Sequence, residues 1–116
     1  MAEIVDLEEA IARHDLAALG RVAARRRPWA VLVDDNFHHM DESERATHGR
    51  FATLEEALAA CRAIVDEDLA RLAAANPGTG GPALFDLYAQ FGADPWVAGS
   101  TWSAWDYARE RCLRAR

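Results

Sequence analysis

Residues 33–46 hold the densest set of side chains in this chain that could do chemistry. The stretch reads VDDNFHHMDESERA, with five acids and two adjacent histidines between two apolar runs. Carboxylate, imidazole and amide groups titrate, accept hydrogen bonds and ligate cations. We therefore place the candidate binding site here, on a set of polar residues: Asp34, Asp35, Asn36, His38, Asp41 and Glu42.

Acid–base catalysis is one chemistry that this spacing allows. Asp35 and His38 are three residues apart, so they can meet across a turn and give an oriented imidazole. With Asp41 they would form the catalytic site of a small hydrolase- or isomerase-like enzyme. The chain has no Gly-x-Ser-x-Gly motif and no catalytic-cysteine context. The enzyme therefore stays the alternative hypothesis.

A metal site is a second chemistry to weigh. The oxygen and nitrogen groups of the stretch suit zinc or manganese, but an HxxxH pair and a calcium-loop spacing are both missing. His38 and His39 are adjacent, so on an extended chain they face opposite sides. We predict no metal site and no cofactor.

A purely structural role would explain the same residues. Asp34, Asp35 and Asn36 follow a strand, where short polar side chains bond nearby amides. Phe37 and Met40 would then pack into the core, and an acidic capping pattern would start one or two helical turns over 42–48, with Gly49 after them. The length of the connection argues against this as the full explanation, because long loops tend to be functional.

The flanking elements predict an α+β domain, with a small antiparallel sheet of about three strands packed against several helices. We expect strands at 29–33, 50–52 and 96–98, with a turn at Asp94-Pro95. Thr53 and Glu56 form a capping-box pattern that starts a helix ending near Asn76. Its apolar stripe comprises Leu54, Leu58, Cys61, Val65, Leu69 and Leu72. The acids at 66–68 lie mostly off that stripe, so we interpret them as solvated.

Two further helices follow. Pro82 suits the first turn of a helix that Gly92 ends, and Ser103 caps the last helix, whose inner face carries Trp105, Ala108 and Cys112. Before the sheet, residues 7–26 favour one helix or two short ones. We divide the chain into an N-terminal helical extension, 1–28, and the α+β domain, 29–116, which form one globular unit.

Charge, apolar runs and cysteines indicate which partners and which cellular location are compatible with the sequence. The net charge is −6, and residues 29–70 carry ten acids against three arginines, so nucleic acid is a poor partner. Apolar runs fall short of the about 18 residues that a membrane span needs, and no signal peptide is evident. Cys61 and Cys112 lie in apolar surroundings and favour reduced core thiols of a cytoplasmic protein.

Residues 29–112 resemble a family of short uncharacterised bacterial proteins, a domain of unknown function. The segments that carry the resemblance are DDNFHHMDE at 34–42, GRFATLEEA at 49–57 with Cys61, FGADP at 91–95 and SAWDYA at 103–108. The family form has tyrosine where this chain has His39, which implies that position 39 is not essential. The family implies no activity, cofactor or partner.

We expect a cytoplasmic, non-enzymatic binding or accessory protein that contacts a protein or a small ligand. The aromatic cluster Trp96, Trp102, Trp105 and Tyr107 fits core packing or an association surface. A small sheet with open edges also favours a homodimer.

Overall fold

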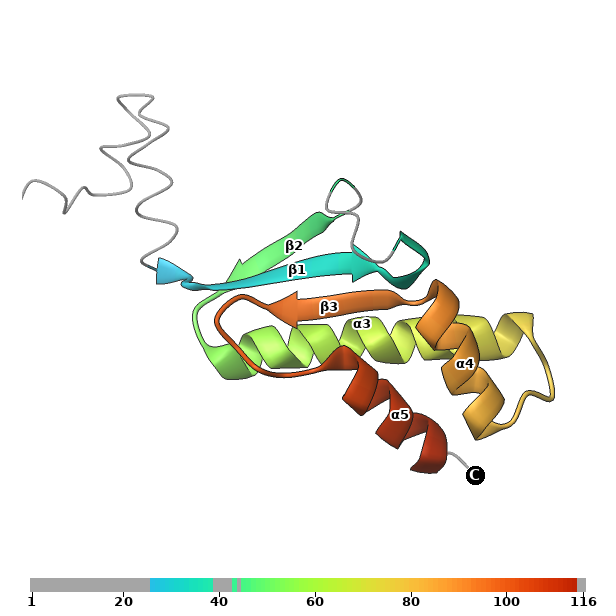
Figure 1. Cartoon of the computed structure of the whole chain (residues 1–116). Helices are drawn as coiled ribbons and strands as arrows, with labels where there is room; N and C mark the ends of the chain where they lie inside the picture. The colour runs from blue at the N-terminus through green and yellow to red at the C-terminus, as the bar shows by residue number, and fades with distance from the viewer. Residues whose placement is uncertain (1–25, 39–42, 44, 115–116) are drawn as a thin grey trace, which may run out of the picture.

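A three-stranded antiparallel sheet and the helices beside it make up the part of the chain that the computed structural model describes, residues 26–38, 43 and 45–114 (Figure 1). The predicted α+β class is confirmed. The elements in chain order are β1 (Trp29–Asp35), the 3-10 helix η1 (Asn36–His38), β2 (Ala46–Phe51), α3 (Leu54–Ala75), α4 (Gly81–Phe91), β3 (Ala93–Val97) and α5 (Ala104–Arg114).

The central strand of the sheet is β1, and the strand order is β2-β1-β3. Both neighbours run antiparallel to β1, with Val31 opposite Gly49 on one side and Val97 on the other. Side chains alternate along a strand, so Val31 and Val97 point toward α3, where both are buried. The helix α3 contacts all three strands, and α4 and α5 pack against it and each other.

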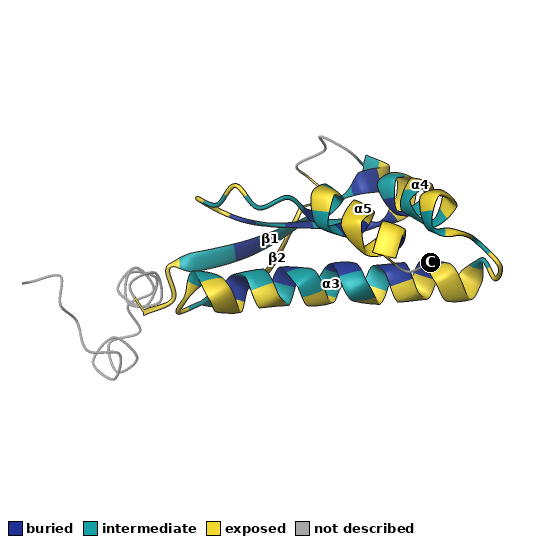
Figure 2. Cartoon of the chain, turned by 90° about the horizontal axis from the view of Figure 1, so that it is seen from below, coloured by how far each residue is buried: buried dark blue, intermediate teal, exposed yellow. Residues whose placement is uncertain are grey.

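The helix α3 begins where the capping box predicted it. Thr53 accepts a hydrogen bond from the Glu56 amide, and the Glu56 side chain accepts one from the Thr53 amide. Its buried stripe contains Ala57, Cys61, Val65, Leu69 and Leu72, and Figure 2 shows this stripe on the side that faces the strands and the other helices. Leu54 and Leu58 are only half-buried. One helix thus links two core clusters, one under the sheet and one against α4 and α5.

Two local predictions between the strands were wrong. Residues 46–48 belong to β2, not to a helical turn, because Ala46 and Thr47 pair with Val33 and Leu32 of β1. The strand pairing outweighs the local capping signal. Asp94 and Pro95 likewise lie within β3 and do not form a turn. Proline is tolerated there because β3 is an edge strand.

The acids at 66–68 were also misinterpreted in part as solvated. Asp66 accepts hydrogen bonds from the Tyr107 hydroxyl and from Arg111 Nε, and so ties α3 to α5. Asp68 accepts one from the Ala93 amide, which ties α3 to β3. Both carboxylates therefore make tertiary contacts, whereas Glu67 is exposed as expected.

None of the helices in the described ranges is long and apolar enough to cross a membrane. The predicted N-terminal helices, residues 7–25, lie outside the described residues, as do His39, Met40, Asp41, Glu42 and Glu44.

Both cysteines are free and buried, as predicted. Burial raises the pKa of the Cys61 thiol to about 11 and also raises the pKa of Cys112. Thiolate is the reactive form, so we expect a thiol reagent at pH 8 to label the folded chain at least ~100-fold more slowly than the denatured chain. Rapid labelling of a folded chain would mean that α3 or α5 opens readily.

Candidate functional site

The segment after β1 is held in place by one buried polar side chain, Asn36. Its Nδ2 donates to the Tyr88 carbonyl at 3.0 Å, and its Oδ1 accepts from the Trp105 indole at 3.1 Å. Its backbone amide donates to the Gly92 carbonyl. Asn36 is only 8% exposed. The Asn36 side chain therefore joins η1 to α4 and α5. Its donor and its acceptor both have partners within the protein.

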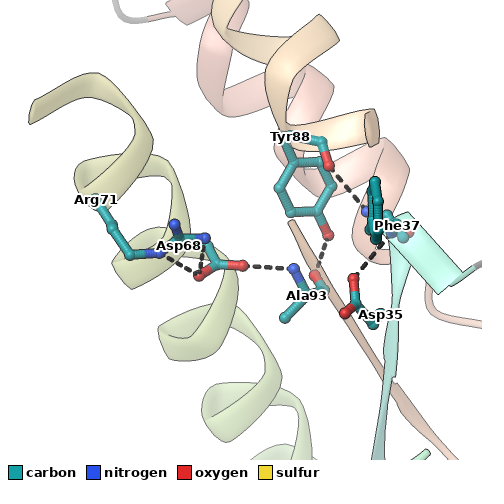
Figure 3. A network of polar contacts seen from close by, with 7 residues as sticks. Asp35, Phe37, Asp68, Arg71, Tyr88 and Ala93 are labelled. Carbon is teal, nitrogen blue, oxygen red and sulfur yellow. Dashed lines mark hydrogen bonds and ion pairs between the residues drawn. The ribbon is translucent and has the colours of Figure 1, made fainter. Parts of the chain in front are cut away.

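Tyr88 accepts the hydrogen bond from Asn36 and also contacts the strand β3. Its hydroxyl donates to the Ala93 carbonyl at 2.7 Å, and its side chain is fully buried (Figure 3). Burial, with the negative charges of Asp94 and Asp68, raises the pKa of Tyr88 far above its ordinary value. Gly92 passes so close that a Cβ there would lie 2.3 Å from the Tyr88 ring, so only glycine fits at this position.

With Asn36 buried, the next residue is forced outward. Phe37 is 64% exposed, so the prediction that it packs into the core was wrong. Its ring stacks on Phe91 of α4, with 5.8 Å between ring centroids, and meets the His38 ring edge-on at 5.0 Å. Phe91 is itself 47% exposed. We call Phe37, His38 and Phe91 the aromatic corner.

Asp35 binds two residues of the aromatic corner, Phe37 and His38. One carboxylate oxygen accepts from the Phe37 amide at 2.9 Å, and the other lies 3.0 Å from His38 Nδ1. Partial burial raises the pKa of the Asp35 carboxyl, but the hydrogen bonds to His38 and Phe37 outweigh it and lower the pKa below its ordinary value. The Asp35–His38 pair predicted from the spacing is thus present, and so is the predicted bond to a backbone amide.

A hollow of about 250 Å³ opens beside the aromatic corner. It lies where the end of β1, the starts of β2 and β3, and the helix α3 meet. Its lining residues are Val33, Asp34, Asp35, Ala46, Asp68, Arg71, Phe91 and Ala93. We call it the acidic hollow, because three carboxylates face one guanidinium there. Figure 3 shows Asp68 bound to both Arg71 and Ala93, with Asp35 on the other side of Ala93.

The predicted site residues divide into three groups. Asp34 and Asp35 line the hollow, and Asp34 is also paired with Arg45 at 2.7 Å. His38 belongs to the aromatic corner, and Asn36 is the anchor behind it. Asp41 and Glu42 lie outside the described residues.

Sequence reasoning missed Phe91, Asp68 and Arg71 because they lie far from the loop along the chain. The one available signal was a phenylalanine at the very end of a helix, next to Gly92. Across the described ranges, no three histidine, cysteine, aspartate or glutamate residues are grouped so that they could hold a metal ion.

A larger hollow, about 340 Å³, lies between α3, α4 and α5, with Leu69, Leu84 and Cys112 among its walls. Its arginines pair with neighbouring acids, Arg111 with Asp66 and Arg114 with Glu110, just as Arg71 of the acidic hollow pairs with Asp68. None of the predicted site residues that the structure describes, Asp34, Asp35, Asn36 and His38, lines it. We therefore regard the aromatic corner and the acidic hollow as the better candidate site.

No protein-family model, curated protein or solved structure matches this chain. The resemblance of residues 29–112 to a bacterial family therefore stays a prediction.

Proposed function

We propose that this chain is a non-enzymatic binding or accessory protein that docks its partner on the aromatic corner and the acidic hollow. The proposal is based mainly on the stacking of Phe37 on Phe91, because both phenyl rings are about half exposed to solvent. Buried hydrogen bonds of Asn36 hold the backbone that presents Phe37. Exposed aromatic rings on a fixed backbone are typical of contact residues in protein interfaces.

The charge of the hollow indicates which partner would fit. Asp34, Asp35 and Asp68 stand against a single lining arginine, Arg71. A cationic side chain would find carboxylates in the hollow and phenyl faces at its rim, where cation–π attraction adds to the ion pairing. We propose a partner segment that places a lysine or arginine beside an apolar side chain.

Selection from a random peptide display library on the full-length chain tests this proposal. We expect selected peptides to combine basic and apolar residues, and binding of a synthetic one to weaken at least about tenfold in Phe37→Ala and in Phe91→Ala. Leu113→Ala is the matched control, since Leu113 is 48% exposed on α5; its binding should stay within about twofold of wild type. Peptides that bind all three variants equally would refute the assignment of this surface.

The alternative is an acid–base enzyme, a small hydrolase or isomerase, and the Asp35–His38 contact at 3.0 Å favours it. His38 does not, however, line the acidic hollow, so the imidazole and the cavity are not combined as a catalytic site requires. An activity lost in both Asp35→Asn and His38→Gln, but kept in Phe91→Ala, would support the enzyme over the binding protein.

We also propose that the protein works in the cytoplasm. Its two free, buried cysteines support this, because thiols stay reduced in that compartment.

A further inference from the structure

The sheet has a second face, opposite α3, whose side chains belong to neither core cluster. Because side chains alternate, Ala30, Leu32 and Asp34 of β1 point away from the core that holds Val31. Their cross-strand partners share that side: Arg50, Thr47, Trp96 and Asp94. We call these seven residues the outer face. Figures 1 and 2 together show the helix α3 passing along one side of the strands.

The centre of the outer face is apolar. Leu32 lies directly opposite Trp96 in the β1–β3 pairing. The Arg45 guanidinium, bound to Asp34, lies 5.1 Å from the centre of the Trp96 ring. Leu32 and Trp96 are both half-buried. An apolar strip on a sheet face is the usual basis of sheet-on-sheet packing.

The two ends of the outer face have opposite charge. The end of β1 near the acidic hollow carries Asp34 and Asp94, with one arginine, Arg45, bound to Asp34. The other end carries Arg50, whose Nε donates to the Arg27 carbonyl at 2.9 Å, and next to it Arg26.

The arginines at that end are unlike the rest. Every other arginine in the described ranges pairs with a carboxylate. Arg26, Arg27 and Arg50 form no ion pair with any described residue and are exposed. In a chain of net charge −6, three exposed arginines that pair with no described carboxylate indicate a surface that fits an acidic counterpart.

We propose that the outer face is the interface of a homodimer, in which two copies stack these faces about a two-fold axis that runs across the strands. This axis reverses the strand direction of the second copy, so the arginine end of each copy meets the aspartate end of the other, twice per dimer. An axis along the strands would instead set Asp34 against Asp34. Charge therefore selects the first arrangement, and Leu32 and Trp96 form its apolar centre.

Sedimentation equilibrium of the full-length chain at about 150 mM salt tests the dimer. We expect a dimer that weakens as salt rises. Arg50→Glu and Asp34→Arg should each raise the dissociation constant at least about tenfold, because each variant turns both end contacts into repulsions. Arg114→Glu, the same charge reversal at the end of α5, is the control and should leave the dimer unchanged.

Mixing the two variants gives the sharpest result. In the mixed dimer Glu at 50 meets Arg at 34, and the native Arg50 meets the native Asp34, so both contacts become attractive again. We expect the mixture to dimerise about as tightly as wild type while each variant alone does not.

Three outcomes would overturn the proposal. One is a mixture no tighter than its components, and another is an Arg50→Glu chain that dimerises as well as wild type. The third is a monomeric wild-type chain. If the wild-type chain were monomeric and Leu32→Asp strongly lowered its free energy of unfolding, Leu32 would be buried within the monomer. The outer face would then be covered by the chain's own residues and not by a second copy.

Discussion

Replacing Asn36 by alanine should lower the free energy of unfolding by about 2–4 kcal/mol. The substitution leaves the Trp105 indole without its acceptor and the Tyr88 carbonyl without its donor, and a buried polar group without a partner costs about 1–3 kcal/mol. Urea unfolding followed by circular dichroism measures the loss.

Asn76→Ala is the matched control for that experiment. The Asn76 amide donates to the Leu72 carbonyl of its own helix end, where water can take its place. We expect a loss below about 1 kcal/mol there. If Asn36→Ala cost no more than Asn76→Ala, Asn36 would not be the anchor of η1.

Replacing Tyr88 by alanine should cost still more, about 3–5 kcal/mol. Its ring is the largest fully buried side chain of the described residues, and its loss leaves a cavity in the core cluster that α4 shares with α3 and α5. Tyr88→Phe keeps the ring and removes only the hydrogen bond to the Ala93 carbonyl, so it should cost about 1–2 kcal/mol. Equal losses in the two variants would mean that the ring is not packed.

The Tyr88 hydroxyl should also make stability fall in alkali. Burial raises the pKa of Tyr88 in the folded chain above its ordinary value, about 10 in the unfolded chain. Below that pH the hydroxyl is protonated in both states; above it only the unfolded chain ionises, so folding weakens as the pH rises. The loss of stability between pH 9 and 11 should therefore be smaller in Tyr88→Phe than in wild type. An identical loss would show that Tyr88 ionises freely in the folded state.

Elements with strong local signals could be predicted from the sequence. The capping box at Thr53, the apolar run from Trp29, the Pro82 start and the Ser103 cap each act within a few residues, so neighbours along the chain determine them. The strand β1 and the helices α3, α4 and α5 were accordingly confirmed.

What could not be predicted depends on residues far apart in the sequence. Residues 46–48 carry a local helix signal, but pairing with β1 makes them a strand. Phe37 is the most hydrophobic type in its loop, yet Asn36 takes the buried position, because its partners Tyr88 and Trp105 lie 52 and 69 residues away. The Tyr88 carbonyl needs a donor and the Trp105 indole needs an acceptor, and the Asn36 side-chain amide supplies both. No local sequence pattern indicates this pairing.

The candidate site, too, could be predicted from the sequence only in part. Asp34, Asp35 and His38 were identified because they are adjacent in the chain and chemically conspicuous. Phe91, Asp68 and Arg71 come from α4 and α3 and join them only through folding. An ordinary phenylalanine and an ordinary i,i+3 ion pair, Asp68–Arg71, give no sign by themselves that they line a site.

The most direct test of the account is a nuclear magnetic resonance titration of the full-length chain with a selected basic, apolar peptide. We expect the amide signals of Phe37, His38, Phe91 and Ala93 to shift most. The Phe37→Ala chain, folded and within about 1 kcal/mol of wild-type stability, should show almost no shift. Shifts centred instead on Leu69, Leu84 and Cys112, or unchanged binding by Phe37→Ala, would contradict the claim that the partner docks on the aromatic corner.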